Sequence, residues 1–242
     1  MRTEIKKILD KVFNPFGLKI ERYFGEELPL KKLVKIAEEN NIDLLMDVGA
    51  NTGQFALKMM EAGYKQHIVS FEPLSSAYPT LLECAKPHKK WQIYDRCAVG
   101  DMDGTIDINI SMNSHSSSIR QISKVHTDAA PSAAFVSKET VAIKKLDSIA
   151  SDFASYENIL LKIDTQGFEK NVLDGAELLL NDKVKVIQLE MSLLPLYEGV
   201  IPFEDLVAYL QKQKFKPLFY SPGYIDRNTD QIQQLEGYFL KA

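Results

Sequence analysis

The chain has 242 residues, of which 45% are hydrophobic and 26% are charged, and its formal net charge is -4 at pH 7. This length fits one large α/β domain with an additional N-terminal segment, and the composition is that of an ordinary globular protein. The negative charge argues against a nucleic-acid partner held by its phosphates, because such proteins usually carry a basic excess.

The chain contains two cysteines, Cys84 and Cys97. They lie too far apart for a CxxC site and no histidine pair has zinc spacing, so we expect no metal. Few cysteines favour a reducing compartment, and the charged N-terminus has no apolar stretch typical of a signal peptide. No apolar run reaches the roughly 18 residues needed to span a membrane. We therefore expect a cytoplasmic protein without a transmembrane segment.

Residues 1–40 are predicted to form an N-terminal helical extension, followed by one domain over residues 41–242. Apolar residues recur at helical spacing in the first 13 residues, with lysines between them, and Asn14-Pro15 breaks the pattern. A second helix is expected over residues 30–39. The basic amphipathic pattern of residues 1–13 permits weak contact with a membrane surface, and it equally permits a helix that caps the core or mediates an oligomer.

From residue 43 the pattern alternates between strands and helices. Strands are expected at 43–48, 67–72, 91–99, 105–110, 140–143, 159–163, 184–191, 216–220 and 237–241. Helices are expected at 54–62, 75–85, 169–180 and 203–213, and residues 111–138 form a long loop. This alternation predicts a mostly parallel sheet covered by helices on both faces, with a ligand at the carboxyl ends of the strands.

The first strand runs into the loop Asp47-Val48-Gly49-Ala50-Asn51-Thr52-Gly53. Because glycines lack a Cβ atom, such a loop can bring its backbone close to a ligand. A dinucleotide-binding loop needs the pattern G-x-G-x-x-G, but Asn51 and Gln54 occupy two of its glycine positions. The spacing instead matches a site for a nucleoside without phosphates.

Carboxylates end several of the predicted strands. Glu72 ends the second strand, where an acid can accept hydrogen bonds from both hydroxyls of a ribose. Asp47 precedes the glycines and could face the positive end of a cofactor. Asp164 and Glu190 end two later strands on the same rim. Clustered acids repel one another, so a bound cation, either organic or metallic, would offset the repulsion.

Together these segments resemble the FkbM family of S-adenosylmethionine (SAM)-dependent methyltransferases, and the similarity covers residues 42–240. The matching segments are residues 46–53, 71–73, 98–101, 146–147 and 162–169, with Leu173 and Gly175-Ala176. The resemblance implies the Rossmann-like class I methyltransferase fold, an α/β fold with a seven-stranded, mostly parallel sheet and an antiparallel last strand.

The resemblance also implies SAM as the cofactor and O-methylation of a hydroxyl, often on a sugar or a secondary metabolite. The residues that it places at the cofactor are Asp47, Gly49, Asn51, Gly53, Glu72, Ala98 and Asp164. Glu72 would hold the ribose, and Asp164 would lie beside the methionine end or the acceptor. A small-molecule or saccharide acceptor is the expected partner.

A sugar hydroxyl is a poor acid, so a general base or a metal would help the transfer. The candidate bases are Asp164, Glu190 and His115, which lies among serines in the long loop. The alternative for His115 is that it lies in a solvent-exposed polar loop and has no catalytic role. At the level of function, the alternatives are a non-catalytic SAM-binding protein and an NAD-dependent oxidoreductase, which the missing third glycine disfavours.

Overall fold

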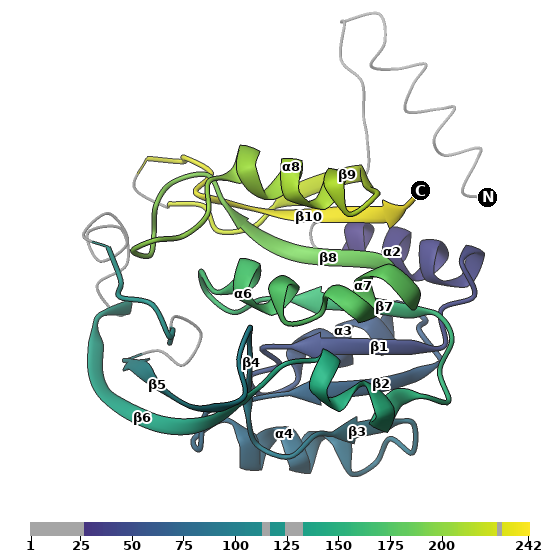
Figure 1. The fold of residues 1–242 in the computed structure, drawn as a ribbon, viewed down its shortest axis with the longest axis horizontal. Coiled ribbons are helices and arrows are strands. Elements are labelled where there is room, and N and C mark those ends of the chain that lie inside the picture. Colours follow the sequence, from purple (N-terminus) through teal and green to yellow (C-terminus); the bar gives the residue numbers. More distant parts are fainter. Residues whose placement is uncertain (1–26, 113–116, 124–132, 227–228) are drawn as a thin grey trace, which may run out of the picture.

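A computed structural model describes residues 27–112, 117–123, 133–226 and 229–242 (Figure 1). The predicted helix and membrane contact of residues 1–13 and the candidate base His115 lie outside these ranges. Within them, no helix is both long and apolar enough to cross a bilayer.

The centre of the molecule is a seven-stranded sheet with the strand order β3-β2-β1-β7-β8-β10-β9. Its strands are β1 (Leu44–Val48), β2 (His67–Phe71), β3 (Trp91–Ile93), β7 (Ile159–Ile163), β8 (Val184–Ser192), β9 (Phe215–Pro222) and β10 (Gln234–Lys241). Strand β10 pairs antiparallel with both β8 and β9, and the other pairs in the sheet are parallel. The predicted class I methyltransferase fold is thus confirmed.

Helices cover both faces of this sheet (Figure 1). One layer holds α2 (Glu27–Glu39), α3 (Gln54–Glu61) and α4 (Tyr78–Ala85), and the other holds the 3-10 helix η4 (Asp147–Phe153), α6 (Glu169–Asp174), α7 (Glu177–Asp182) and α8 (Phe203–Lys212). Alternate residues of a strand point to opposite faces, so Leu44 and Met46 pack in one layer and Leu45 in the other. Helix α2 contributes Leu33, which is fully buried in the same cluster as Leu45.

The predicted strand 91–99 is wrong, because it is two strands in two sheets. After β3 the chain exposes Asp95 and Arg96, and then β4 (Ala98–Val99) joins a three-stranded sheet with the order β4-β6-β5. Strands β5 (Gly104–Ser111) and β6 (Phe135–Lys144) form its antiparallel pair. Both were expected as shorter strands, because their alternating pattern does not reveal how far the pairing extends.

The single helix predicted over residues 169–180 is also wrong, because it breaks into α6 and α7 at Gly175. A Cβ atom at Gly175 would lie 1.8 Å from the carbonyl oxygen of Gly100. The carboxylate of Asp147 then accepts hydrogen bonds from the amides of Leu178 and Leu179 in the first turn of α7. The break therefore depends on partners distant in the sequence.

Candidate functional site

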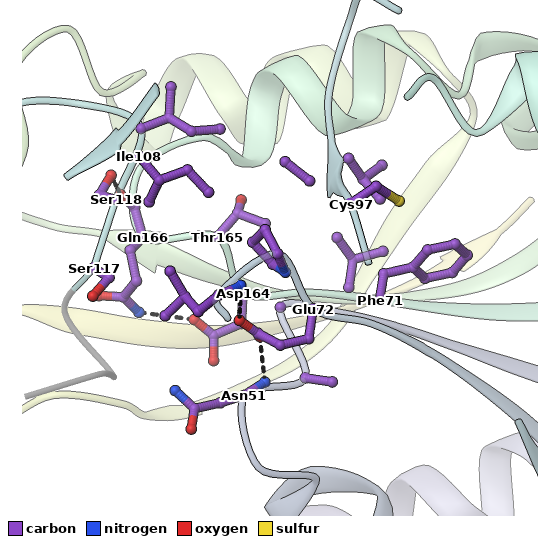
Figure 2. A pocket seen from close by; sticks show the side chains of 18 of the residues that line it. Asn51, Phe71, Glu72, Cys97, Ile108, Ser117, Ser118, Asp164, Thr165 and Gln166 are labelled. Carbon is purple, nitrogen blue, oxygen red and sulfur yellow. Dashed lines mark hydrogen bonds between the residues drawn. The ribbon is translucent and has the colours of Figure 1, made fainter. Parts of the chain in front are cut away.

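A cavity opens at the carboxyl ends of β1, β2 and β7, where the predicted site residues gather (Figure 2). Five of them line it: Gly49, Asn51, Glu72, Ala98 and Asp164. The three-stranded sheet, including Ile108, and the segment 117–119 supply further parts of the wall. The cavity thus lies at the edge of the sheet where ligands of parallel α/β folds bind.

The two glycines of the first loop have different functions. Gly49 has a φ of 77° and lines the cavity, and a Cβ atom there would lie 1.8 Å from the carbonyl oxygen of Asp164. Gly53 has a φ of 92° and precedes α3, and its Cβ atom would lie 2.6 Å from the ring of Trp91. The described part of the cavity wall includes Gly49 but not Gly53, which supports the loop from behind.

Glu72 is nearly fully buried at the end of β2 and holds two backbone amides. Its Oε2 accepts a hydrogen bond of 2.7 Å from the amide of Asn51, and its Oε1 accepts one of 2.8 Å from the amide of Leu74. Burial raises the pKa of Glu72 to about 7, although these two hydrogen bonds and the nearby Lys162 lower it. Each carboxylate oxygen has two lone pairs, so both oxygens can still accept a hydrogen bond from a ligand hydroxyl.

Asp47 is fully buried and does not belong to the described cavity wall. Its Oδ1 lies 2.9 Å from Nζ of Lys162, and its Oδ2 accepts a hydrogen bond from the hydroxyl of Ser70 at 3.3 Å. The indole of Trp91 in turn donates to Ser70. Asp47 therefore neutralises a protein cation behind the loop.

Lys162 was not predicted as a site residue, yet it lines the cavity. Its Nζ donates to the carbonyl oxygen of Gly49 at 3.0 Å and lies 3.8 Å from Oδ2 of Asp164. Burial lowers the pKa of Lys162, but Asp47 and Asp164 raise it by more, so that the net shift is upward and the ammonium stays charged. A lysine within the otherwise apolar strand β7 was the signal that could have identified it.

Asp164 and Glu190 lie on either side of Gln166. The side-chain nitrogen of Gln166 donates to Oδ1 of Asp164 and to Oε2 of Glu190, both at 2.8 Å. Asp164 and Gln166 belong to the described cavity wall, whereas Glu190 does not. Burial raises the pKa of Glu190 well above its ordinary value, and the neighbouring carboxylates of Asp164 and Glu236 add to this shift. Glu190 therefore reaches the cavity only through Gln166.

The turn between β7 and α6 is held by the first residue of α6, Glu169. Its Oε1 accepts hydrogen bonds from the amides of Thr165 and Gly167 at 3.1 and 3.0 Å. Burial raises the pKa of Glu169 to about 7 against the effect of these bonds.

Within the described residues, no group of three or more His, Cys, Asp or Glu side chains is arranged to hold a metal ion.

Part of the predicted loop 111–138 forms a wall of the cavity. Ser117, Ser118 and Ile119 line it, and Figure 2 shows the two serines on the same side as Gln166. Ser118 exchanges backbone hydrogen bonds with Asn109 of β5, and its hydroxyl donates to the carbonyl oxygen of Gln166 at 2.6 Å. This segment therefore lies beside the end of β7.

These residues fit a nucleoside cofactor. Gly49 has no side chain and Ala98 has a small one, so they and the apolar Leu74 leave room for a flat base and a ribose. Glu72 supplies a buried acceptor for hydroxyl groups. No phosphate-binding glycine pattern is present in the loop. The site thus matches the nucleoside portion of SAM.

Comparison with solved structures gives likenesses over most of both chains at low identity. PH1948 from Pyrococcus horikoshii, assigned as an RNA methyltransferase, is 12% identical, with a TM-score of 0.46 and coverage of 92% of this chain and 87% of that chain. Sp1610 from Streptococcus pneumoniae, determined in complex with SAM, is 12% identical, with a TM-score of 0.46 and coverage of 87% and 72%. A Staphylococcus aureus protein assigned as a caffeoyl-CoA O-methyltransferase is 9% identical, with a TM-score of 0.44 and coverage of 97% and 91%.

No curated protein matches the chain. The family model of the methyltransferase FkbM domain matches residues 47–217, which include the first loop, the strand ends that carry Glu72 and Asp164, and the turn at Gln166. This match spans more than half of the chain and covers every described residue of the cavity wall. The chain therefore belongs to the FkbM family, and it is a SAM-dependent methyltransferase.

Proposed function

We propose that the enzyme methylates a hydroxyl oxygen of a sugar, a glycan or a secondary metabolite. The observation that carries this proposal is the position of Asp164. Its side chain is 36% exposed and lies in the cavity between the first loop and the serine-bearing segment 117–119. A carboxylate beside hydroxyl side chains suits an acceptor that brings a hydroxyl group and loses a proton.

On this proposal the first loop and its neighbours hold the cofactor. The backbone of Gly49 and Asn51 contacts it closely, Ala98 leaves room for the base, and Glu72 accepts hydrogen bonds from the ribose. Asp47 and Gly53 act from behind, because Asp47 fixes Lys162 and Gly53 lets α3 pack against β3. SAM supplies an electrophilic methyl group on a sulfonium.

Asp164 is the candidate general base. It would take the proton that the acceptor hydroxyl loses when its oxygen accepts the methyl group from the sulfonium, and the hydroxyl of Ser117 would orient the acceptor. Because the thioether is a good leaving group, alignment of the acceptor oxygen with the methyl group of SAM contributes much of the rate. The cavity wall would provide this alignment. Glu190 supports Asp164 through Gln166, and His115 remains a second candidate from the loop.

The proposal predicts that Asp164→Asn lowers methyl transfer at least about 100-fold, because general-base catalysis typically contributes about that much. Its affinity for SAM should change little. The assay is transfer of labelled methyl from SAM to a panel of saccharides and nucleotide sugars, with calorimetry for SAM binding.

Asp174→Asn is the matched control, because Asp174 pairs with Lys170 on α6 and does not line the described cavity. It should keep full activity. Transfer to amines or thiols but to no hydroxyl would contradict O-methylation, and an active Asp164→Asn enzyme would exclude Asp164 as the base.

A further inference from the structure

The side-chain amide of Gln166 connects two carboxylates from neighbouring strands. Its Nε2 donates at 2.8 Å to Asp164 at the end of β7 and at 2.8 Å to Glu190 in β8. Because one nitrogen reaches both, the two acceptor oxygens cannot be farther apart than twice that distance. Figure 2 shows the amide of Gln166 directed at the carboxylate of Asp164.

The orientation of this amide is determined by a third side chain. The hydroxyl of Tyr197, which is fully buried, donates to Oε1 of Gln166 at 2.7 Å. The opposite orientation would place the amide oxygen against two carboxylates, which is unfavourable. The ring of Tyr197 packs on Gly167, where an added Cβ atom would lie 3.1 Å from the ring. The nitrogen of Gln166 therefore faces the carboxylates in one defined position.

The backbone of Gln166 is constrained as well. Its φ is 53°, a left-handed conformation that is unusual for a residue with a side chain, and its carbonyl oxygen accepts a hydrogen bond from Ser118. Strained backbone of this kind persists where the surroundings hold it in place, and it is common at functional sites. Gln166 is thus held from both its backbone and its side chain.

The charges around Asp164 explain why a neutral amide is useful here. Asp164 faces Lys162 on its own strand, Glu169 on α6 and Glu190 on β8, and Glu236 on β10 lies opposite Glu190. An amide can donate to two carboxylates at once without gaining or losing a proton. It therefore offsets the repulsion between Asp164 and Glu190 when both are ionised, and its own charge does not change with pH.

We propose that Gln166 is a positioning residue that orients the carboxylate of Asp164 toward the acceptor, with Tyr197 fixing the amide and Glu190 anchoring its far side. This inference rests on the proposed role of Asp164 as the base. Glu190 and Tyr197 act through Gln166 and not on the acceptor itself.

The test follows the carboxyl-carbon signal of Asp164 by 13C NMR at one fixed pH, in the enzyme without cofactor or acceptor. The Asp164 signal is assigned with Asp164→Asn. In Gln166→Leu, loss of the hydrogen bond from the Gln166 amide should move this signal away from its wild-type position. Tyr197→Phe should produce a smaller shift in the same direction, and it serves as the test if Gln166→Leu does not fold.

Gln234→Leu is the matched control. The amide of Gln234 also donates to Oε2 of Glu190, at 2.6 Å, but within the described part of the chain it forms no hydrogen bond with Asp164. It should move the Asp164 signal by less than Gln166→Leu does, because it acts on Asp164 only through Glu190. An Asp164 signal at the same position in the wild type and Gln166→Leu would overturn the inference, as would an equal displacement in Gln234→Leu. Because this measurement uses neither SAM nor acceptor, its failure can be distinguished from a failure of hydroxyl methylation in the transfer assay.

Discussion

Lys162 is the residue on which the arrangement of the site most depends. It forms a buried ion pair with Asp47 and donates to the loop carbonyl of Gly49, so it connects β7 to the glycine loop. Removing one partner of a buried pair leaves an uncompensated charge, which is far more destabilising than losing a surface pair.

Lys162→Leu is therefore expected to lower the free energy of unfolding by about 3–5 kcal/mol, because Asp47 would remain buried without its cation. Urea denaturation measures this change. Lys35→Leu is the control, since Lys35 forms an exposed pair with Glu39 whose side chains are 75% and 59% exposed. That variant should change stability by less than about 1 kcal/mol. Equal costs in the two variants would contradict the assigned role of the buried pair.

Residues 117–123 have no regular secondary structure, yet hydrogen bonds to several other segments fix their position. The side-chain nitrogen of Asn109 donates to the carbonyl oxygens of Ser118 and Arg120 at 3.2 and 3.3 Å. The side chain of Arg120 donates to the carbonyl oxygen of Gly167. The backbone amide of Ser123 donates to the carbonyl oxygen of Leu196. The wall of the cavity therefore depends on long-range hydrogen bonds.

Asn109→Leu should loosen this segment, because it removes donors to several carbonyl oxygens. Amide exchange of residues 117–123 should accelerate by roughly tenfold, equivalent to about 1.4 kcal/mol of local stability. Hydrogen exchange with mass spectrometry measures it. The control Asn40→Leu removes a bond to the carbonyl oxygen of Ile36 in α2 and should leave the segment unchanged. Equal acceleration in β1 and β7 would indicate global destabilisation and contradict a local role for Asn109.

At the scale of the whole molecule, buried acids make stability depend on pH. Glu72 and Glu169 both have a pKa of about 7 in place of the ordinary 4.5, chiefly because of burial. Between these values the folded protein keeps protons that the unfolded chain has released. The stability from these groups is therefore present at low pH and is lost as the pH rises through about 7.

The free energy of unfolding should thus fall between about pH 5 and about pH 8, by at most on the order of 3 kcal/mol for each group. Urea denaturation across this range measures the slope. The double variant with Glu72→Gln and Glu169→Gln should flatten the profile, because neither amide titrates. Stability that rises with pH in the wild type would contradict the assignment.

Much of the fold and the cofactor loop was predictable, because both depend on local pattern. Apolar runs such as residues 159–163 mark central parallel strands, and Asn51 and Gln54, which stand where a dinucleotide loop has glycines, argued against a dinucleotide. Glu72 and Asp164 were placed at the cavity because they end parallel strands, whose carboxyl ends share one edge.

The tertiary structure alone decided which of these residues line the cavity and which support it. Asp47 and Glu190 end strands just as Glu72 and Asp164 do, but Asp47 turns to Lys162, and Glu190 lies behind Gln166. The hydrogen bonds of Gln166 join residues 24 and 31 positions apart, and those of Ser118 cross from a loop to a strand end. Local sequence indicated the central strands and the glycine loop, whereas the partner of a buried polar group depends on the packing of the whole chain.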